Sequence, residues 1–284
     1  IVWKSLADVL NGLDSVLSED DVLHQKYQEF ARALILPLSA RVGWEASESD
    51  DHVTTLLRVV MIQLLSSFCA QDESVQKEAK RRFDLFWKNP MDMQALPSDY
   101  RAAVFSIVLQ NGDLALYNQI KSYYLTAHNT AEAKLVLSSL GSINDVDLKW
   151  ATMEWATSGE IKLQDFFYLM GSVSRSNKQG RNVAWKYFTQ EFDKIQKMLA
   201  TASPSLMNAV IVLCCGAGAT HEKASAVESF FQQHSHQLIG NDRKIAQTVE
   251  SLQTNAQFLD ILLASPLATQ EEFLTHMIAQ VKKA

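Results

Sequence analysis

The sequence predicts an all-α protein. Its 284 residues include only five prolines and ten glycines, which is too few turn residues for a sandwich or barrel of this length. Apolar residues recur at helical spacing almost from end to end, and no segment shows sustained strand alternation. The prolines, such as Pro97 and Pro204, tend to separate the long periodic segments. Stacked helices are therefore favoured over any sheet.

The N-terminal third carries three long apolar stripes. They run from Trp3 to Leu17, from Leu23 to Leu38 and from His52 to Phe68, and the third stripe includes Leu56 and Gln63. Between the second and third stripes, an acidic loop is expected over 45–51, solvated and ending in good N-cap residues. Further helices are predicted at 73–87, 97–110, 203–215, 220–235, 241–263 and 268–282.

Three breaks between helices recur with a spacing of 33 residues, at Asn111, Asn144 and Asn177. An aromatic residue follows soon after each break, at Tyr117, Trp150 and Trp185. Two helices per unit of this length are typical of an α-solenoid of stacked antiparallel pairs. The diagnostic patterns of tetratricopeptide and ankyrin repeats are absent, so a HEAT- or armadillo-like stack is predicted.

Charge and cysteine usage exclude several classes of function. The net charge of −6, with dispersed Lys and Arg, argues against a nucleic-acid partner. The longest apolar run, 209–219, is too short to span a bilayer, so no membrane partner is predicted. Cys214 and Cys215 are adjacent within that run and the remaining cysteine is Cys69, which disfavours a disulfide framework. A reducing, cytoplasmic location is expected.

One short motif suggests a metal site. His221-Glu222 matches half of the helical His-Glu-x-x-His pattern, in which two histidines four residues apart bind zinc. Ser225 occupies the second histidine position, so we expect Thr220 simply to begin a helix, with Glu222 near its positive end. Neither a Ser-His-Asp nor a Cys-His arrangement emerges from spacing. No catalytic residue and no metal ligand is therefore predicted in this chain.

The stretch from Gln164 to Phe188 combines an apolar helix, a basic turn containing glycine, and a second amphipathic helix predicted from Asn182. Arg175, Lys178 and Arg181 fall within seven residues of one another in this turn. On a concave surface they would hold a carboxylate, and arginine suits bidentate geometry. The alternative is a solvated loop, in which Arg175 and Lys178 complement the negative end of the preceding helix.

Five motifs in order resemble the C-terminal helical domain of the gluzincin zinc aminopeptidases, closest to the puromycin-sensitive type. The first is the stretch 164–188 described above. The other four are Val42-Gly-Trp44-Glu with Asp51-His through Leu57-Arg58, Leu96-Pro-Ser-Asp-Tyr-Arg101, Ala226-Val-Glu-Ser-Phe-Phe231, and Gln253-x-Asn255 through Phe258-Leu. Each motif alone is weak, but their shared order is specific.

The resemblance implies a single C-terminal domain over 1–284, a fragment of a longer chain, curved into a bowl. Such a domain encloses the chamber for a peptide substrate and closes over the catalytic domain that precedes it. By the resemblance, Arg175, Lys178 and Arg181 are candidate contacts to the peptide's C-terminal carboxylate. Zinc and the family's catalytic motifs would lie upstream of Ile1, so the fragment is expected to be inactive alone. The alternative is a non-enzymatic α-solenoid scaffold that binds a protein partner on its concave face.

Overall fold

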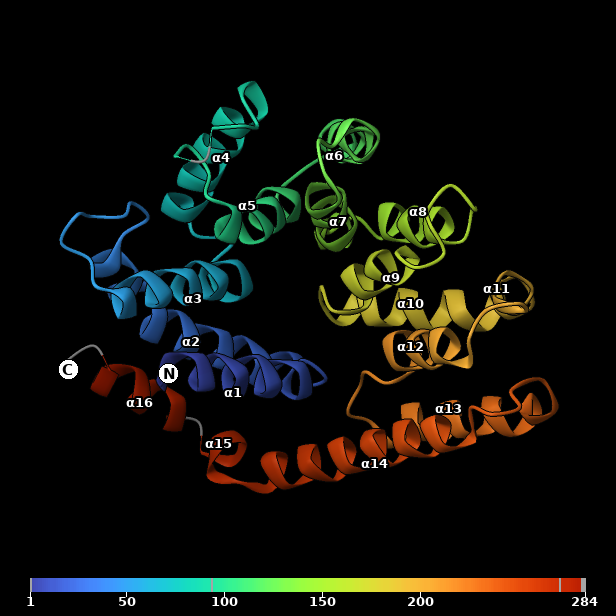
Figure 1. Cartoon of the computed structure of the whole chain (residues 1–284). Coiled ribbons are helices and arrows are strands. Elements are labelled where there is room, and N and C mark those ends of the chain that lie inside the picture. The colour runs from blue at the N-terminus through green and yellow to red at the C-terminus, as the bar shows by residue number, and fades with distance from the viewer. Residues whose placement is uncertain (1, 93, 271, 282–284) are drawn as a thin grey trace. The chain divides into compact units, whose positions relative to one another are not determined.

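The structure, a computed structural model, describes residues 2–92, 94–270 and 272–281, and its regular structure there is entirely helical (Figure 1). The all-α prediction is confirmed for these residues. The helices of the N-terminal part are α1 (Val2–Leu17), α2 (Asp21–Val42), α3 (His52–Phe68), α4 (Glu73–Lys88) and α5 (Ser98–Gln110). The central helices are α6 (Leu114–Thr126), α7 (Thr130–Ser139), α8 (Val146–Ala156), α9 (Phe166–Ser174), α10 (Lys178–Gln190), α11 (Phe192–Leu199) and α12 (Pro204–Cys215). The last are α13 (His221–Gln233), α14 (Asp242–Ala264), α15 (Pro266–Thr269) and α16 (Phe273–Val281), with short 3-10 turns η1 (Leu140–Ser142) and η2 (Ser235–Gln237).

The chain divides into two compact units. Unit 1 contains the residues up to Asn111 and those from Leu263 onward, and unit 2 contains Gly112–Leu262. The single domain expected over 1–284 therefore stays a prediction.

Unit 1 is organised around α2, which packs against α1, α3 and α16, while α5 packs against α3 and α4. Its buried residues include Ala31 and Ile35 of α2, both fully inaccessible to solvent. The hydroxyl of Tyr27 donates to the carbonyl of Leu10 at 2.8 Å, which satisfies a polar group inside the α1–α2 contact. Further along, Phe105 meets the edges of two rings of α4 in T-shaped contacts.

Three buried arginines explain several residues of the resemblance motifs in unit 1. Arg58 of α3 is paired with Asp50 at 2.7 Å and donates to the carbonyl of Val42. Arg82 of α4 contacts Glu78 and Glu45, and its guanidinium lies over the Trp44 ring. Arg101 of α5 donates to the carbonyls of Leu96 and Pro90 and lies over the Phe86 ring. The motif residues therefore anchor loops through charged groups removed from solvent.

The acidic loop over 45–51 is largely exposed, as expected for a solvated loop, but two of its carboxylates are paired with buried arginines. Asp51 does cap α3, since its side chain accepts from the amide of Thr54 at 2.7 Å. Its neighbour Asp50 is engaged by the buried Arg58, and Glu45 reaches the buried Arg82. The loop is thus fixed to α3 and α4 by ion pairs that the sequence pattern did not reveal.

The buried face of α3 also differs from the predicted stripe. Leu56 is 54% exposed and Gln63 is exposed, whereas Arg58 is 1% exposed. The apolar residues that face inward are Met61, Ile62, Leu64, Leu65 and Phe68. The predicted stripe is therefore right at Leu64 and Phe68. Its N-terminal part selects the wrong residues, because the long cationic side chain of Arg58 faces inward there.

Unit 2 stacks its helices in chain order, as Figure 1 shows from α6 through α13. The α9 helix lies at its centre and packs against α7, α8, α10 and α12. At one side, Phe188 and Phe192 form an aromatic cluster with Phe230 of α13. Phe188 is fully buried, while Trp185 is half-buried beneath the ammonium group of Lys223.

Two pairs of asparagines in unit 2 are joined by side-chain hydrogen bonds, one between two breaks and one between a break and the interior of α12. The side-chain amide of Asn177 donates to Asn144 at 3.3 Å, and that of Asn241 donates to Asn208 at 2.8 Å. Both pairs are 33 residues apart. Asn111, at the end of unit 1, instead donates to the carbonyl of Ala70. Of the three predicted breaks, those at Asn144 and Asn177 are therefore physically linked.

Most predicted helix positions are confirmed, including 203–215 and 241–263, which are α12 and α14. The helix predicted over 268–282 is confirmed in its later part, but its predicted start is wrong, because α15 ends at Thr269 and Gln270 adopts an extended backbone. A new helix, α16, runs from Phe273 to Val281, and position 282 lies outside the described residues.

Candidate functional site

The predicted basic turn is a tight junction between α9 and α10. Arg175 follows the last residue of α9 as its C-cap, and Asn177 is the N-cap of α10. The Asn177 side chain accepts from the amide of Gly180 at 2.8 Å, which fixes the start of α10. The prediction that this helix begins at Asn182 is wrong, because the capping asparagine begins it four residues earlier. Lys178 and Arg181 therefore lie in the first turn of a helix rather than in a loop.

The electrostatic environment of the three cations differs between the two helix ends. Arg175 lies at the C-terminus of α9, where a positive charge is favourable. Lys178 and Arg181 lie at the N-terminus of α10, whose first turn contains no acidic residue. Cations are unfavourable at this positive helix end, and the two side chains, three residues apart, share one face. Helix dipole and side-chain charge together make this end of α10 attractive to an anion.

The three side chains also differ in accessibility and partners. Arg175 is exposed, and its guanidinium lies beside Gly171, where an added Cβ would be 3.9 Å from a terminal nitrogen. Lys178 and Arg181 are half-buried, and each already interacts with other groups of the protein. Among the three, Arg175 is therefore the most accessible to a ligand.

The backbone beneath the junction is packed too closely to accept a side chain at Gly180. A Cβ there would lie 2.1 Å from the carbonyl oxygen of Val173 and 2.3 Å from the hydroxyl of Ser176. Ser176 in turn donates to the Val173 carbonyl at 2.8 Å. The glycine of the basic turn thus permits a close approach of α10 to the end of α9.

A buried lysine connects the junction to the preceding helix pair. Lys149 of α8 is fully buried, and its ammonium nitrogen is 2.7 Å from both the Gly141 carbonyl and the Ser176 hydroxyl. Burial lowers the pKa of Lys149 to about 7. Gly141 also contacts α9 directly, since its amide donates to the Ser172 hydroxyl at 3.0 Å. Lys149 therefore fixes the turn that carries the three cations.

Lys149 belongs to no cluster of charge in the sequence, so charge patterning does not identify it. One signal was present: Lys149 shares a helical face with Thr152, Met153 and Ala156, which are buried. A lone cation on the apolar face of a short helix indicates a buried amine with specific partners. Gly141 accepts the hydrogen bond from Lys149 through its backbone carbonyl, so its residue type gives no indication of this contact.

The half zinc motif is explained without a metal. Thr220 caps α13, as predicted, and His221 lies 2.8 Å from Asp260 in an exposed pair. Ser225 is exposed. Within residues 2–92, 94–270 and 272–281, no three or more His, Cys, Asp or Glu side chains are grouped so as to hold a metal ion. The described side chains therefore offer no set of ligands for a zinc ion, and the zinc that the resemblance implies is expected in the upstream domain.

The three cysteines are free and buried, and burial raises the pKa of Cys69 and Cys214 to about 12.

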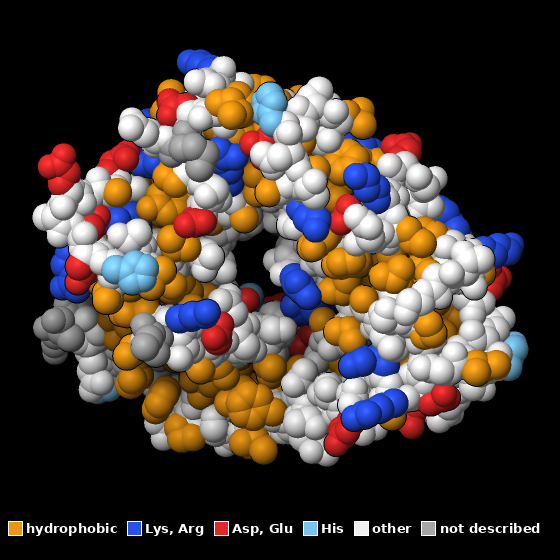
Figure 2. Space-filling view, viewed as in Figure 1, with side chains coloured by type: hydrophobic (Ala, Val, Ile, Leu, Met, Phe, Trp, Pro, Cys, Tyr) orange, Lys and Arg blue, Asp and Glu red, His pale blue; other side chains and the backbone are white. Residues whose placement is uncertain are grey.

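On the face shown in Figure 2, Lys and Arg side chains are scattered among acidic and uncharged ones. No single helix in the described part of the chain is long and apolar enough to cross a membrane. Taken together, α3 and α4 are long and apolar enough by length and composition, but the two helices are bent by 115° at the break between them.

The fold and the junction define a class: an all-helical domain that carries a basic helix junction and, over its described residues, no grouped metal ligands. Residues 1–254 match the model of the ERAP1-like C-terminal domain. The chain belongs to that family, which is found in aminopeptidases.

Known relatives include whole aminopeptidases. The chain is 25% identical over 281 residues to Aminopeptidase M1-B of Oryza sativa subsp. japonica, covering 97% of this chain and 31% of that protein. It is 26% identical over 262 residues to the Alanine/arginine aminopeptidase of Saccharomyces cerevisiae, covering 91% of this chain and 29% of that protein. With Aminopeptidase M1 of Arabidopsis thaliana the identity is 28% over 246 residues, covering 86% and 26%. The chain thus spans under a third of the length of these relatives.

Proposed function

We propose that this chain is the substrate-chamber domain of a zinc aminopeptidase of the puromycin-sensitive type. In this proposal the helices form an α-solenoid curved into a bowl, and the domain closes over a zinc site in the preceding part of the polypeptide. The observation that carries the proposal is the family match over 1–254, together with relatives that are named aminopeptidases and are over three times as long. The free, buried cysteines support a cytoplasmic location for the parent protein.

The domain's part in the reaction is positional. It holds the peptide far from the scissile bond and excludes water when it closes, while the catalytic groups lie in the other domain. The α9–α10 junction is the proposed grip for the C-terminal carboxylate of the substrate. Support comes from Arg175, Lys178 and Arg181, which bring three cations to one junction, two of them at a helix N-terminus.

The grip is tested in the full-length protein with Arg175→Ala and Arg181→Ala. Each variant should lower kcat/KM for long peptides about tenfold, the value expected when one charge-assisted hydrogen bond is lost. A single-residue aminoacyl reporter, which does not reach the junction, should be cleaved at the wild-type rate. For peptides with an amidated C-terminus, kcat/KM should be the same for wild type and variant.

Lys162→Ala is the matched control, since Lys162 is an exposed cation of unit 2 outside the junction. Equal losses on peptide and reporter, or the same loss for an amidated peptide, would remove the carboxylate grip. A reading frame upstream of Ile1 that encodes no zinc motif would contradict the aminopeptidase proposal itself. It would favour a scaffold that binds a protein partner.

A further inference from the structure

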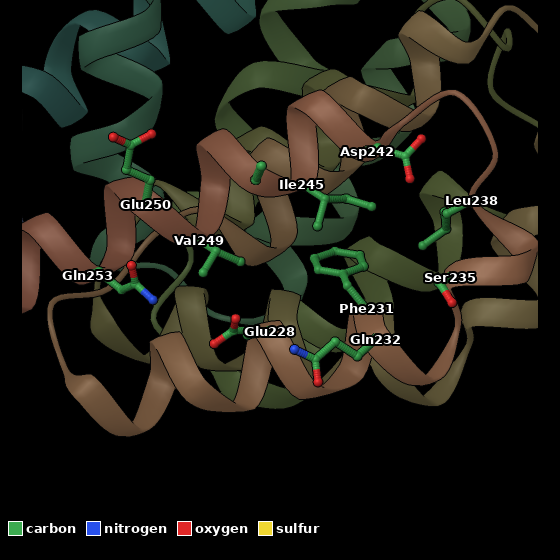
Figure 3. Close-up of a pocket in the computed structure, with 11 residues that line it drawn as sticks. Glu228, Phe231, Gln232, Ser235, Leu238, Asp242, Ile245, Val249, Glu250 and Gln253 are labelled. Atoms are coloured by element: carbon green, nitrogen blue, oxygen red, sulfur yellow. The ribbon is translucent and has the colours of Figure 1, made fainter.

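A groove with an apolar floor lies between α13 and α14 in unit 2 (Figure 3). Its volume is about 420 Å³, within the range of pockets that hold small ligands or peptide side chains. Phe231 of α13 lies opposite Ile245 and Val249 of α14, and Leu238 closes one end. Phe231, Leu238 and Val249 are buried by the protein itself, while Ile245 is half-buried. The floor is thus already formed, and Ile245 supplies its most accessible large apolar side chain.

The rim of this groove carries one sign of charge. Glu228 of α13 and Asp242 and Glu250 of α14 line it, and all three are exposed. None of these carboxylates has an ion pair or a side-chain hydrogen bond within the described part of the chain. The lining includes no Lys or Arg, and the neighbouring Lys244 is turned to Gln247 at 3.0 Å.

We propose that this groove binds a linear peptide segment in which Lys or Arg stands beside apolar side chains. An apolar side chain of the segment lies on the floor and loses its contact with water, which drives association. Its cationic neighbours meet the carboxylates of the rim, and an acidic segment is repelled by the same groups. This site is separate from the α9–α10 junction and extends beyond the proposed grip on a peptide carboxylate.

Binding is measured by fluorescence anisotropy of labelled peptides added to the purified chain. Both peptide termini are blocked, so a C-terminal carboxylate grip contributes nothing to the signal. A peptide of alternating Lys and Leu should bind, and one of alternating Glu and Leu should not. Raising the salt concentration should lower the affinity for the basic peptide, because the rim carboxylates are exposed to solvent and are screened.

Two groups of variants test the location. Glu228→Gln combined with Glu250→Gln should weaken the basic peptide about fivefold, since two exposed pairs are lost. Ala246→Arg, at an exposed lining position of α14, should abolish binding by adding bulk and positive charge. The matched control is Glu222→Gln, an exposed carboxylate of α13 outside the lining, which should leave affinity unchanged.

Three results would overturn the proposal. The first is equal binding of the basic and acidic peptides to the wild-type chain. The second is an affinity for the lining variants that matches the Glu222→Gln control. The third is the absence of any binding of the basic peptide to the wild-type chain at low salt. Because the peptides have no free carboxylate, each result leaves the aminopeptidase proposal untouched.

Discussion

Lys149 illustrates how one side chain can organise the candidate site without touching a ligand. Its ammonium group is held by one carbonyl and one hydroxyl, both neutral, in the interior of unit 2. The loss of hydration on burial disfavours the charged form and lowers the pKa from 10.5 to about 7. Lys149 is therefore a positioning residue whose charge changes near neutral pH.

The pH dependence of stability tests this assignment. Between pH 7 and 10.5 the unfolded chain binds a proton at Lys149 that the folded chain does not, so the free energy of unfolding should rise with pH in that window. The rise is at most about 1.4 kcal/mol per pH unit. Lys149→Met should lack this contribution, and the difference between wild type and variant isolates it from other titrating groups.

Lys162→Met, which changes an exposed lysine, serves as the control and should follow the wild-type profile. The measurement is chemical denaturation at a series of pH values. A difference between wild type and Lys149→Met that stays constant from pH 6 to pH 10 would contradict the pKa assigned to Lys149 by its burial.

At the scale of the element, the loop between α2 and α3 shows why a motif can be specific without being catalytic. Gly43 has a φ of 69°, a conformation that favours glycine, and its amide donates to the Ser39 carbonyl. Asp50 then pairs with Arg58 inside unit 1, and Asp51 caps α3. Gly43, Asp51 and Arg58 of this motif thus have structural roles in placing the loop and beginning the helix.

The Asp50 pair gives a second stability prediction. A hydrogen bond from the Ser47 amide, with the Arg58 guanidinium beside it, lowers the pKa of Asp50. Its stabilisation is therefore complete above the ordinary value of 3.8 and is lost as the pH falls through the lower folded pKa. Asp50→Asn leaves the buried Arg58 without a charged partner and should lower Tm by a few degrees at neutral pH.

Glu48→Gln is the control for Asp50→Asn, since Glu48 is exposed in the same loop. Thermal unfolding by circular dichroism at pH 7 and in acid checks both variants. A Tm for Asp50→Asn equal to that of Glu48→Gln at pH 7 would show that the buried guanidinium does not depend on this carboxylate.

Over the whole chain, the described residues bring no set of metal ligands together, and the chain belongs to a domain family found in longer aminopeptidases. We expect the purified chain to cleave no aminoacyl reporter and to bind no zinc, as judged by a fluorogenic assay and by metal analysis after dialysis. Cleavage sensitive to a chelator would contradict the proposal that catalysis resides in another domain.

Sequence patterns were sufficient for the helix class, most helix positions and the family. Local signals such as Ser203 before Pro204, and Asn177 at a break, are decided by residues close in the chain. The basic junction was identified by the same local means, although the start of its second helix was placed at Asn182 rather than Lys178.

Local sequence patterns therefore specify most of the helices, the asparagine spacing and the three cations at one junction. Contacts between helices specify the inward orientation of Arg58, the burial of Lys149, and the acidic groove between α13 and α14. A charged residue on a helix is expected to be exposed to solvent. Its burial depends on partners that lie elsewhere in the chain, and the sequence of the helix does not identify them. Burial and pairing are properties of contacts between elements, and periodicity within one element does not specify them.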